Sequence, residues 1–373
     1  MATGQGKLDV VIMGLGRVGR AVAEQLQAAM PLLLSRYGVC VRIIGVADQS
    51  GILLHPAGFP PSTMRHVLET KSHGKALSTM PQTSATLDLP WACELATSAT
   101  HDGARIVFVD ATADPELADM WKAVLAAGGA VVLANKLPLS AHWGVSGPLF
   151  AHPRLRYEAT VGAGLPVIST LRALHDSGDR VTHIRASVSG TLAFLLARAM
   201  AGETFSAAVR EAVSAGYAEP DPREDLRGSD VARKGLILAR ALDWPAEPED
   251  VEVESLVCEQ PDEASATGLG RMSSLDEAMS ERVGLAVDRG RVLRYIVSVS
   301  PEEQTIRAGI AALDRSDPFS ASGGTENRIE IRSRSYGDDA LTLCGPGAGP
   351  RVTAMGVLSD LVDLARLSHK EGE

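Results

Sequence analysis

The chain has 373 residues, of which 45% are hydrophobic and 22% charged, a composition typical of folded globular proteins. The formal net charge of -10, without a basic stripe, argues against a nucleic-acid partner. No apolar run is long enough to cross a bilayer, and the first residues lack the apolar part of a signal peptide. The four cysteines have no paired spacing, so we expect no disulfide framework and a reducing, cytoplasmic compartment.

The first chemical pattern joins a strand to a helix through glycines. Residues 8–13 are mostly apolar and predict a buried strand, and an apolar helical pattern begins after residues 14–19. In a dinucleotide-binding unit, Gly14 permits the tight turn, Gly16 lets the backbone approach a pyrophosphate, and Gly19 lets the helix pack on the strand. The helix N-terminus then offers free amides to phosphates. The motif has the required context, so we predict a nucleotide site at Gly14, Leu15, Gly16, Arg17, Val18 and Gly19.

The second predicted strand, residues 41–47, ends in Asp48. A carboxylate there can accept hydrogen bonds from the adenosine ribose, which favours NAD over NADP. Asp48 lies about ten residues further from the glycines than the usual ~20, and residues 31–34 are expected to lengthen the helix or its loop. NADP stays open, because a lysine or arginine folding over the site would hold a phosphate. The candidates are Lys71, Lys75 and Arg65.

Two further strands are predicted at residues 105–110 and 130–134, with a helix at 115–127 between them. In a parallel sheet, the loops after such strands lie where the ligand binds. Lys136 follows the second strand, and contact with cofactor or substrate is as good an interpretation as a solvated side chain. The pattern predicts a doubly wound Rossmann domain over residues 1–150.

A glycine-rich loop at residues 161–166 follows a strand predicted at 155–160, which contains Glu158. One carboxylate beside outward-facing backbone carbonyls can coordinate a hard cation through oxygen. A tight turn before a helix, with Pro166 in its first turn, explains the same residues and is the better local explanation. We expect that helix at residues 167–174.

The densest charged segment runs from Gly216 to Lys234. It contains Glu219, Asp221, Asp225, Asp230 and Lys234. Prolines 220 and 222 and Gly228 are expected to keep its first part out of a helix, and a helical pattern starts at Ser229. Asp230 and Lys234 then lie one turn apart on one face. Such a pair is commonly an exposed helix pair, but beside three more carboxylates it can hold an amino-acid substrate and move a proton.

Helices are predicted at residues 192–201 and 205–215, and alternating apolar residues between 250 and 324 predict strands of a second sheet. This gives a mixed α/β domain at residues 151–340. A late glycine loop at residues 345–350 precedes a helix at 352–367. We expect the segment 341–373 to return to the nucleotide domain.

In this order, the motifs resemble those of the homoserine dehydrogenase family over nearly the whole chain. They are residues 14–19, 134–136, 157–164, 189–191, 216–234 and 345–349. The blocks Glu-Ala-Thr-Val-Gly-Ala-Gly and Gly-Tyr-Ala-Glu-Pro-Asp-Pro are specific to that family, whereas the glycine turn is not. The resemblance implies a reversible, NAD- or NADP-dependent interconversion of L-aspartate 4-semialdehyde and L-homoserine, a step of threonine and methionine biosynthesis.

The resemblance also implies roles for single residues. Lys234 would be the acid/base for the reacting oxygen, and Lys136 would sit between cofactor and substrate. Glu219, Asp225 and Asp230 would hold the substrate and position Lys234, while Thr112 and Gly349 would contact the cofactor. A sodium-type cation would bind the carboxylate of Glu158 and the backbone carbonyls of Val161, Ala163 and Leu165. A homodimer is implied as well, formed by the second domain.

The same comparison suggests a monofunctional enzyme. No aspartate kinase region precedes the glycine turn, and residues 368–373 are too few for a sensing domain. Two other functions remain open. One is a dehydrogenase for a related amino-acid aldehyde or alcohol, and the other is a silent nucleotide-binding regulator. The regulator is disfavoured, because all of the chemistry-bearing residues are present.

Overall fold

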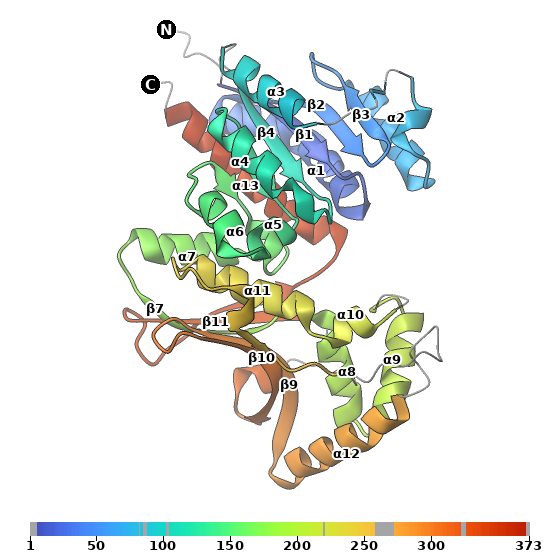
Figure 1. Ribbon diagram of the computed structural model, residues 1–373, viewed down its shortest axis with the longest axis vertical. Coiled ribbons are helices and arrows are strands. Elements are labelled where there is room, and N and C mark those ends of the chain that lie inside the picture. The colour runs from blue at the N-terminus through green and yellow to red at the C-terminus, as the bar shows by residue number, and fades with distance from the viewer. Residues whose placement is uncertain are drawn as a thin grey trace. The chain divides into compact units, whose positions relative to one another are not determined.

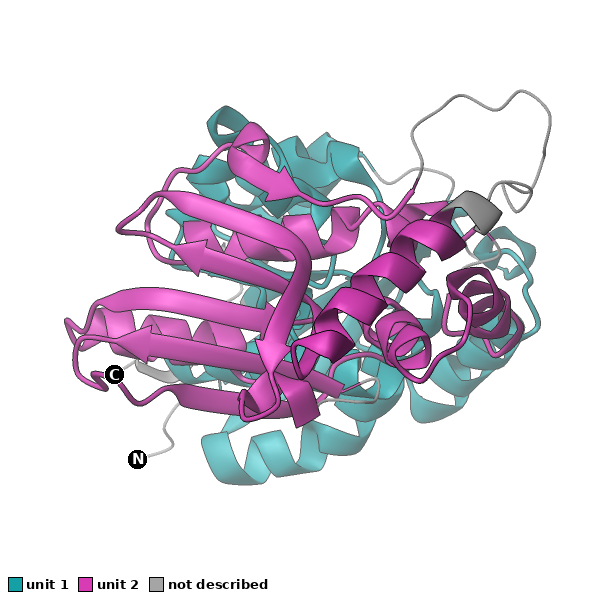
Figure 2. Cartoon of the chain, turned by 90° about the horizontal axis from the view of Figure 1, so that it is seen from below, with its two compact units in different colours: residues 1–164, 349–373 teal, residues 165–348 magenta. Residues whose placement is uncertain are grey.

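Two six-stranded sheets, each with its own helices, organise the chain into two units. The computed structural model describes residues 6–81, 83–84, 88–101, 104–218, 221–257, 272–321 and 326–370. Unit 1 comprises residues 1–164 and 349–373, and unit 2 comprises residues 165–348 (Figure 2). The borders therefore fall in the glycine-rich loop after Glu158 and in the late glycine loop. The predicted fold class, a Rossmann domain joined to a mixed α/β domain, is confirmed.

The sheet of unit 1 has the strand order β3-β2-β1-β4-β5-β6. All neighbours pair in parallel except β3, which returns antiparallel along β2. The strands are β1 (Gly6–Met13), β2 (Val39–Asp48), β3 (Gly51–Leu54), β4 (Ala104–Asp110), β5 (Ala130–Leu133) and β6 (Leu155–Arg156). This is a doubly wound order, and the carboxyl ends of β1, β4 and β5 meet at one edge of the sheet, where ligands bind in such folds.

The helices of unit 1 include the final one of the chain (Figure 1). They are α1 (Arg17–Tyr37), α2 (Pro61–Ser72), α3 (Leu89–His101), α4 (Ala118–Ala126), α5 (Leu137–Ser140), α6 (Trp143–Phe150) and α13 (Pro350–Lys370). Single 3₁₀ turns are η1 (Leu77–Thr79), η2 (Pro115–Leu117) and η3 (Glu158–Thr160). Among the described residues, no helix combines the length and the apolar character that crossing a bilayer requires.

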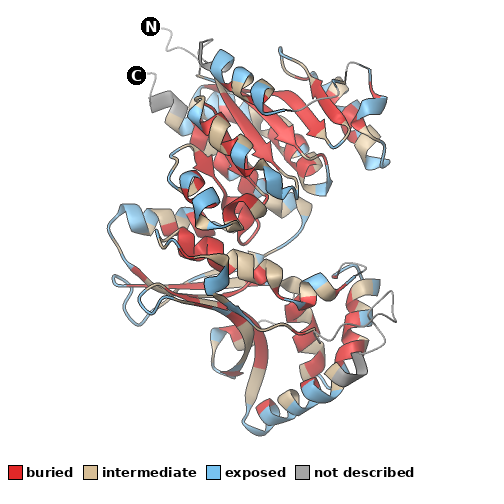
Figure 3. Ribbon diagram, viewed as in Figure 1, coloured by how far each residue is buried: buried red, intermediate tan, exposed pale blue. Residues whose placement is uncertain are grey.

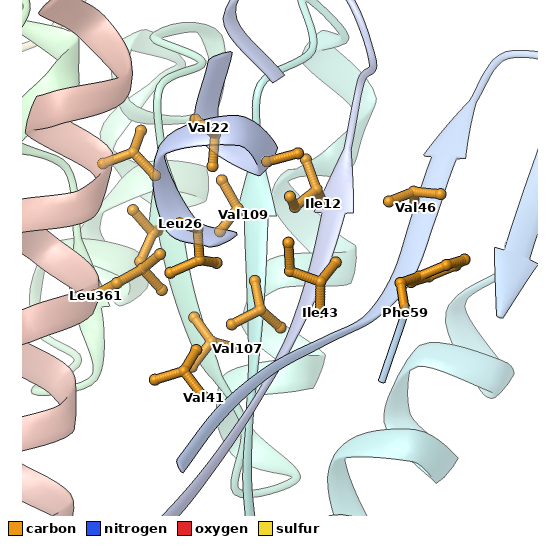
Figure 4. Close-up of a cluster of buried hydrophobic side chains, with 14 of the residues drawn as sticks. Ile12, Val22, Leu26, Val41, Ile43, Val46, Phe59, Val107, Val109 and Leu361 are labelled. Carbon is orange, nitrogen blue, oxygen red and sulfur yellow. The ribbon is translucent and has the colours of Figure 1, made fainter. Parts of the chain in front are cut away.

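One apolar cluster joins the sheet of unit 1 to α1 and α13 (Figure 4). Ile12 of β1 is fully buried, as expected for a central parallel strand covered on both faces. Leu26 of α1 and Leu361 of α13 belong to the same cluster. In α13 the buried positions recur at helical spacing, namely Ala354, Val357, Leu361, Leu364 and Ala365. The helix is therefore an integral part of the core of unit 1.

Of two local predictions in unit 1, one is confirmed and the other is wrong in part. Residues 31–34 lengthen the helix, one of the two expected alternatives, and α1 ends at Tyr37 before the cap Gly38, whose φ of 67° suits glycine. The strand predicted at residues 155–160 was wrong beyond Arg156, because Glu158–Thr160 form the turn η3. The amide of Glu158 donates to Asp360 Oδ2 of α13 at 2.8 Å, a bond that replaces strand pairing.

The sheet of unit 2 has the order β12-β11-β7-β9-β10-β8. Its strands are β7 (Val181–Ser187), β8 (Val251–Val253), β9 (Arg291–Ser300), β10 (Thr305–Asp314), β11 (Glu326–Ser333) and β12 (Leu341–Pro346). Neighbours are antiparallel except β8 and β10, which are parallel. The predicted second sheet is thus present, and it is mixed.

The helices of unit 2 pack against its sheet and against one another, and Figure 3 shows buried residues in red on its strands and helices. The helices are α7 (Val167–Asp176), α8 (Gly190–Met200), α9 (Phe205–Ser214), α10 (Arg223–Leu226), α11 (Ser229–Arg240) and α12 (Met272–Asp288), with the 3₁₀ turns η4 (Pro248–Asp250) and η6 (Pro318–Ala321). The prolines did not exclude helix completely, since α10 forms one turn before Gly228.

Candidate active site

The glycine turn between β1 and α1 is shaped by close backbone contacts. Gly14 has a φ of 88°, and a Cβ there would lie 2.7 Å from the carbonyl oxygen of Ala111. A Cβ on Gly19 would lie only 1.9 Å from the carbonyl oxygen of Gly14. Both positions therefore need glycine to build the turn.

Gly16 differs, because a Cβ there would meet no atom of the described residues within 4 Å. It is the N-cap of α1 and supplies no side-chain cap, so the first amides of the helix are left to other partners. Open space beside free helix amides suits the phosphates of a dinucleotide. Of the predicted residues, Leu15 is buried, Arg17 is exposed and Val18 is half-buried.

The tip of β2 carries a carboxylate that is already strongly bonded. Asp48 Oδ1 accepts from the amide of Ser50 at 2.8 Å and from its hydroxyl at 2.6 Å. Asp48 Oδ2 accepts from the amide of Leu77 at 3.0 Å and from the ammonium of Lys71. Burial opposes the charge, but these bonds, led by Lys71, outweigh it and hold the pKa of Asp48 below its usual range. The Asp48 carboxylate and the Lys71 ammonium therefore lie together where the adenosine end of the coenzyme was predicted to bind.

A second polar group links the loops after β4 and β5. Asp110, the last residue of β4, is fully buried and accepts hydrogen bonds from Thr112, Trp121 and Asn135. Lys136 follows Asn135 as the N-cap of α5 and is half-buried. The predicted cofactor contact Thr112 and the predicted catalytic Lys136 thus stand at one end of the same sheet.

The predicted cation loop lies against α13 within unit 1. Glu158 is 3% exposed, and Val161 is fully buried. Ala163 has a φ of 57°, and a Cβ on Gly356 would lie 2.4 Å from its carbonyl oxygen. Leu165 is the first residue of unit 2, and its carbonyl accepts from the amide of Val167 at 2.8 Å. The four-residue cation set stays a prediction.

Helix α11 of unit 2 holds the predicted acid/base pair. Lys234 Nζ lies 2.7 Å from Asp230 Oδ2 and donates to the carbonyl oxygen of Val188 at 2.6 Å. The Lys234 side chain is 12% exposed, whereas that of Asp230 is 42% exposed. An ordinary surface lysine would be solvated. This ammonium is instead held by two acceptors, the Asp230 carboxylate on α11 and the Val188 carbonyl just before α8.

The remaining predicted site residues are Asp225, Glu219 and Gly349. Asp225 lies on α10 and is half-buried. Glu219 lies outside the described residues. Gly349 is exposed with a φ of 107°, and its carbonyl accepts from the amide and the hydroxyl of Thr353, both at 3.0 Å. Gly349 therefore caps the start of α13 in unit 1.

Comparison with known proteins accounts for these motifs. A family model for homoserine dehydrogenase matches residues 166–362, more than half of the chain. The homoserine dehydrogenase of Emericella nidulans is 34% identical, over 94% of this chain and 96% of its own. The chain belongs to the homoserine dehydrogenase family.

Two further proteins show how much of their own length this chain matches. A bifunctional aspartokinase/homoserine dehydrogenase of maize chloroplasts is 35% identical over 96% of this chain, which spans only 38% of the maize protein. A hyperthermophilic archaeal homoserine dehydrogenase solved with NADPH superposes with a TM-score of 0.72 and 26% identity, covering 96% of this chain and 97% of its own.

Sequence reasoning missed two residues that contact predicted site residues, Val188 on Lys234 and Asp110 on Thr112. Val188 acts through its backbone carbonyl, which no side-chain pattern reveals. Asp110 has a signal in the sequence, because an acidic residue closes an otherwise apolar strand, but the pattern predicts no more than a strand end there. Lys71 had been one of three candidate cations, and the structure places it on Asp48.

Gly235 sets how closely α11 approaches the sheet, and we predict that Gly235→Ala impairs catalysis. A Cβ there would lie 2.6 Å from Val297 Cγ2 and 3.1 Å from Ile306 Cγ2. The helix must move outward and carry Lys234 with it, so turnover should fall up to about 10²-fold, as misplacement by about 1 Å can cause. Steady-state assay of the purified variant measures the effect.

Gly284→Ala is the matched control, because Gly284 is an exposed glycine of α12 with no atom within 4 Å of its Cβ position. It should gain up to about 1 kcal/mol of stability without any change in turnover, since alanine favours the helix. Wild-type turnover in Gly235→Ala would show that the depth of α11 does not control the site.

Proposed function

We propose that this chain catalyses the reversible, NAD(P)-dependent interconversion of L-aspartate 4-semialdehyde and L-homoserine. The observation that carries the proposal is the fixed ammonium of Lys234, held by Asp230 and by the Val188 carbonyl within a chain of the homoserine dehydrogenase family. The glycine turn with its uncapped helix start supplies a place for the coenzyme phosphates.

The charges of the predicted site match this chemistry. Homoserine carries an α-ammonium and an α-carboxylate, so its binding requires anionic and cationic partners. Asp225 and Asp230 would serve the ammonium group, and Lys136 would serve an anionic group. The bound coenzyme supplies or accepts the hydride.

Lys234 is the proposed proton carrier. In the reductive direction its ammonium donates a proton to the carbonyl oxygen, which becomes the hydroxyl of homoserine. In the oxidative direction the neutral amine takes that proton back from the hydroxyl. Asp230 and the Val188 carbonyl orient the amine, so that its third hydrogen points away from both acceptors and toward the substrate oxygen.

We further propose that Asp48 and Lys71 set coenzyme preference in opposite directions. The archaeal neighbour was solved with NADPH, and Lys71 offers the positive charge that a 2′-phosphate needs. Asp48→Ala should weaken NAD more than NADP, whereas Lys71→Ala should weaken NADP more, each about tenfold for loss of one bond to a charged group. Calorimetric dissociation constants for both coenzymes measure this, and equal weakening of both coenzymes by each variant would refute it.

A monovalent cation at Glu158 is also proposed. Its support is a buried carboxylate followed by a turn rich in backbone carbonyls, an all-oxygen donor set that suits a hard cation. Replacing sodium by a bulky quaternary ammonium ion should lower the thermal midpoint of the wild type but not that of Glu158→Gln. Identical midpoints in both salts for the wild type would argue against the cation.

The homodimer and the cytoplasmic location are proposals that rest on the resemblance and on cysteine usage. Sedimentation of the purified chain tests the dimer, and fractionation of the source cells tests the location. A monomer at all concentrations, or enrichment outside the cytoplasm, would remove the respective proposal.

The test of the proposed function is coenzyme reduction with L-homoserine, using NAD and NADP in separate assays. We expect turnover with at least one coenzyme and its loss in Lys234→Ala. No turnover from protein that still binds coenzyme would move the assignment to another amino-acid alcohol or to a regulator.

A further inference from the structure

Asp110 is an ionisable group at the ligand edge of the sheet that the proposed chemistry does not use. Its side chain is completely buried at the end of β4. Burial raises the pKa of this carboxyl, while hydrogen bonds from Thr112, Trp121 and Asn135 act in the opposite direction. A buried carboxylate is costly unless its hydrogen bonds are satisfied, so its presence calls for an explanation.

Each oxygen of Asp110 has two donors. Oδ1 accepts from the amide of Thr112 at 2.9 Å and from its hydroxyl at 2.7 Å. Oδ2 accepts from the indole Nε1 of Trp121 at 2.9 Å and from Nδ2 of Asn135 at 3.2 Å. Three of the four donors are N–H groups, which cannot accept. The pocket therefore requires a hydrogen-bond acceptor at both oxygen positions of the residue 110 side chain.

These donors belong to the two loops that carry predicted site residues. Thr112 lies in the loop after β4 and Asn135 in the loop after β5. Asn135 also donates to the carbonyl of Asp114 at 2.8 Å and accepts from the amide of Leu137 at 3.0 Å. The backbone on both sides of Lys136 is thus fixed by one side chain, which is itself held by Asp110.

We propose that Asp110 is a positioning residue that couples the Thr112 loop to the Lys136 loop and sets the geometry of the nicotinamide end of the site. It acts through Thr112 and Asn135 without touching the substrate. This inference rests on the proposed function for the identity of the ligand, but its test does not depend on turnover of homoserine.

The backbone survives loss of this side chain. The carbonyl oxygen of Asp110 accepts from the amides of Ala134 and Asn135 at 2.8 and 3.2 Å, and these bonds keep β4 joined to the start of the next loop. Asp110→Asn preserves volume and places one NH₂ group against an N–H donor, so it perturbs the coupling while keeping the fold.

Trp121→Phe is the matched control. Trp121 donates to the same carboxylate from α4, which belongs to neither loop. Trp121→Phe removes the indole hydrogen bond alone, whereas in Asp110→Asn the amide nitrogen loses both bonds of the oxygen that it replaces, so both variants lose stability. Only Asp110→Asn also removes the negative charge, which weakens the hydrogen bonds accepted from both loops.

The experiment measures coenzyme dissociation constants by calorimetry and amide hydrogen exchange of residues 111–114 and 135–139. Asp110→Asn should weaken coenzyme binding about tenfold or more and speed exchange in both segments, because misplacement by about 1 Å can cost up to about 10²-fold. Trp121→Phe should stay within about twofold of wild type in binding and leave exchange in both segments unchanged.

Wild-type binding and exchange in Asp110→Asn would overturn the proposal. Equal weakening in both variants would overturn it too, because the residue would then serve stability alone. A wild-type chain that binds coenzyme yet does not oxidise homoserine would sink the proposed function and leave the positioning role testable by the same two measurements.

Discussion

Lys234→Ala is expected to lower turnover by about 10²–10⁴-fold, the range that a positioned proton donor contributes. The ammonium is held by Asp230 at 2.7 Å and by the Val188 carbonyl at 2.6 Å, and alanine removes the proton carrier while leaving α11 helical. Coenzyme affinity should stay close to wild type, because the role proposed for Lys234 is proton transfer and not coenzyme binding. Steady-state kinetics and calorimetry of the purified variant measure the two quantities.

The chain offers a matched control for that variant. Lys122 pairs with Asp119 on α4 at 2.6 Å, in the common exposed arrangement of residues three apart. Lys122→Ala should leave turnover unchanged, because such exposed pairs contribute about 0.2–0.5 kcal/mol to helix stability. The proton-carrier role would be lost if Lys234→Ala kept more than about a tenth of wild-type turnover. Loss of coenzyme binding in that variant would contradict the role as well.

The second large effect concerns two glycines of one turn. Replacing one should lower stability, and replacing the other should lower coenzyme affinity. Gly19→Ala places a Cβ 1.9 Å from the Gly14 carbonyl oxygen, so backbone must move and the protein should lose about 3 kcal/mol or more of stability. Gly16→Ala meets no atom of the described residues within 4 Å and should fold normally. Its added methyl group occupies the approach of the phosphates, so coenzyme affinity should fall about tenfold or more.

Thermal melts in the absence of ligand separate these effects from calorimetric binding of coenzyme. Gly38→Ala is a control for glycine replacement on the same helix, since its Cβ position is also open among the described residues and Gly38, with a left-handed φ of 67°, caps the far end of α1. It should cost stability without changing coenzyme affinity. Normal coenzyme binding by Gly16→Ala would remove the phosphates from this turn.

Local patterns predicted the parts of the fold that local forces decide. Residues 14–19 were expected to join a strand to a helix, and they do so between β1 and α1, because glycine spacing determines that turn. Asp230 and Lys234 were expected on one face of a helix, and they are paired on α11. The strand that includes Glu158 was wrong, because the bond that turns the chain comes from Asp360, 202 residues later in the sequence.

The site was predicted in the same uneven way. Residue types and spacing indicated Lys234 and the glycine turn, and the resemblance added Thr112. The partners of these residues depend on tertiary contacts that the pattern does not contain. Lys71 reaches Asp48 from α2 across 23 residues, and Trp121 and Asn135 reach Asp110 from a helix and a loop.

The place of α13 in the core of unit 1 affects how the chain must fold during synthesis. Leu26 of α1 packs in the same cluster as Leu361, yet residues 165–348 are made between the two parts of the unit. At about 5–20 residues per second, a ribosome needs roughly 10–40 s to bridge that gap. Unit 2 can fold first, while the part of unit 1 already made keeps an apolar face uncovered until α13 is synthesised. Chaperones recognise such exposed apolar surface.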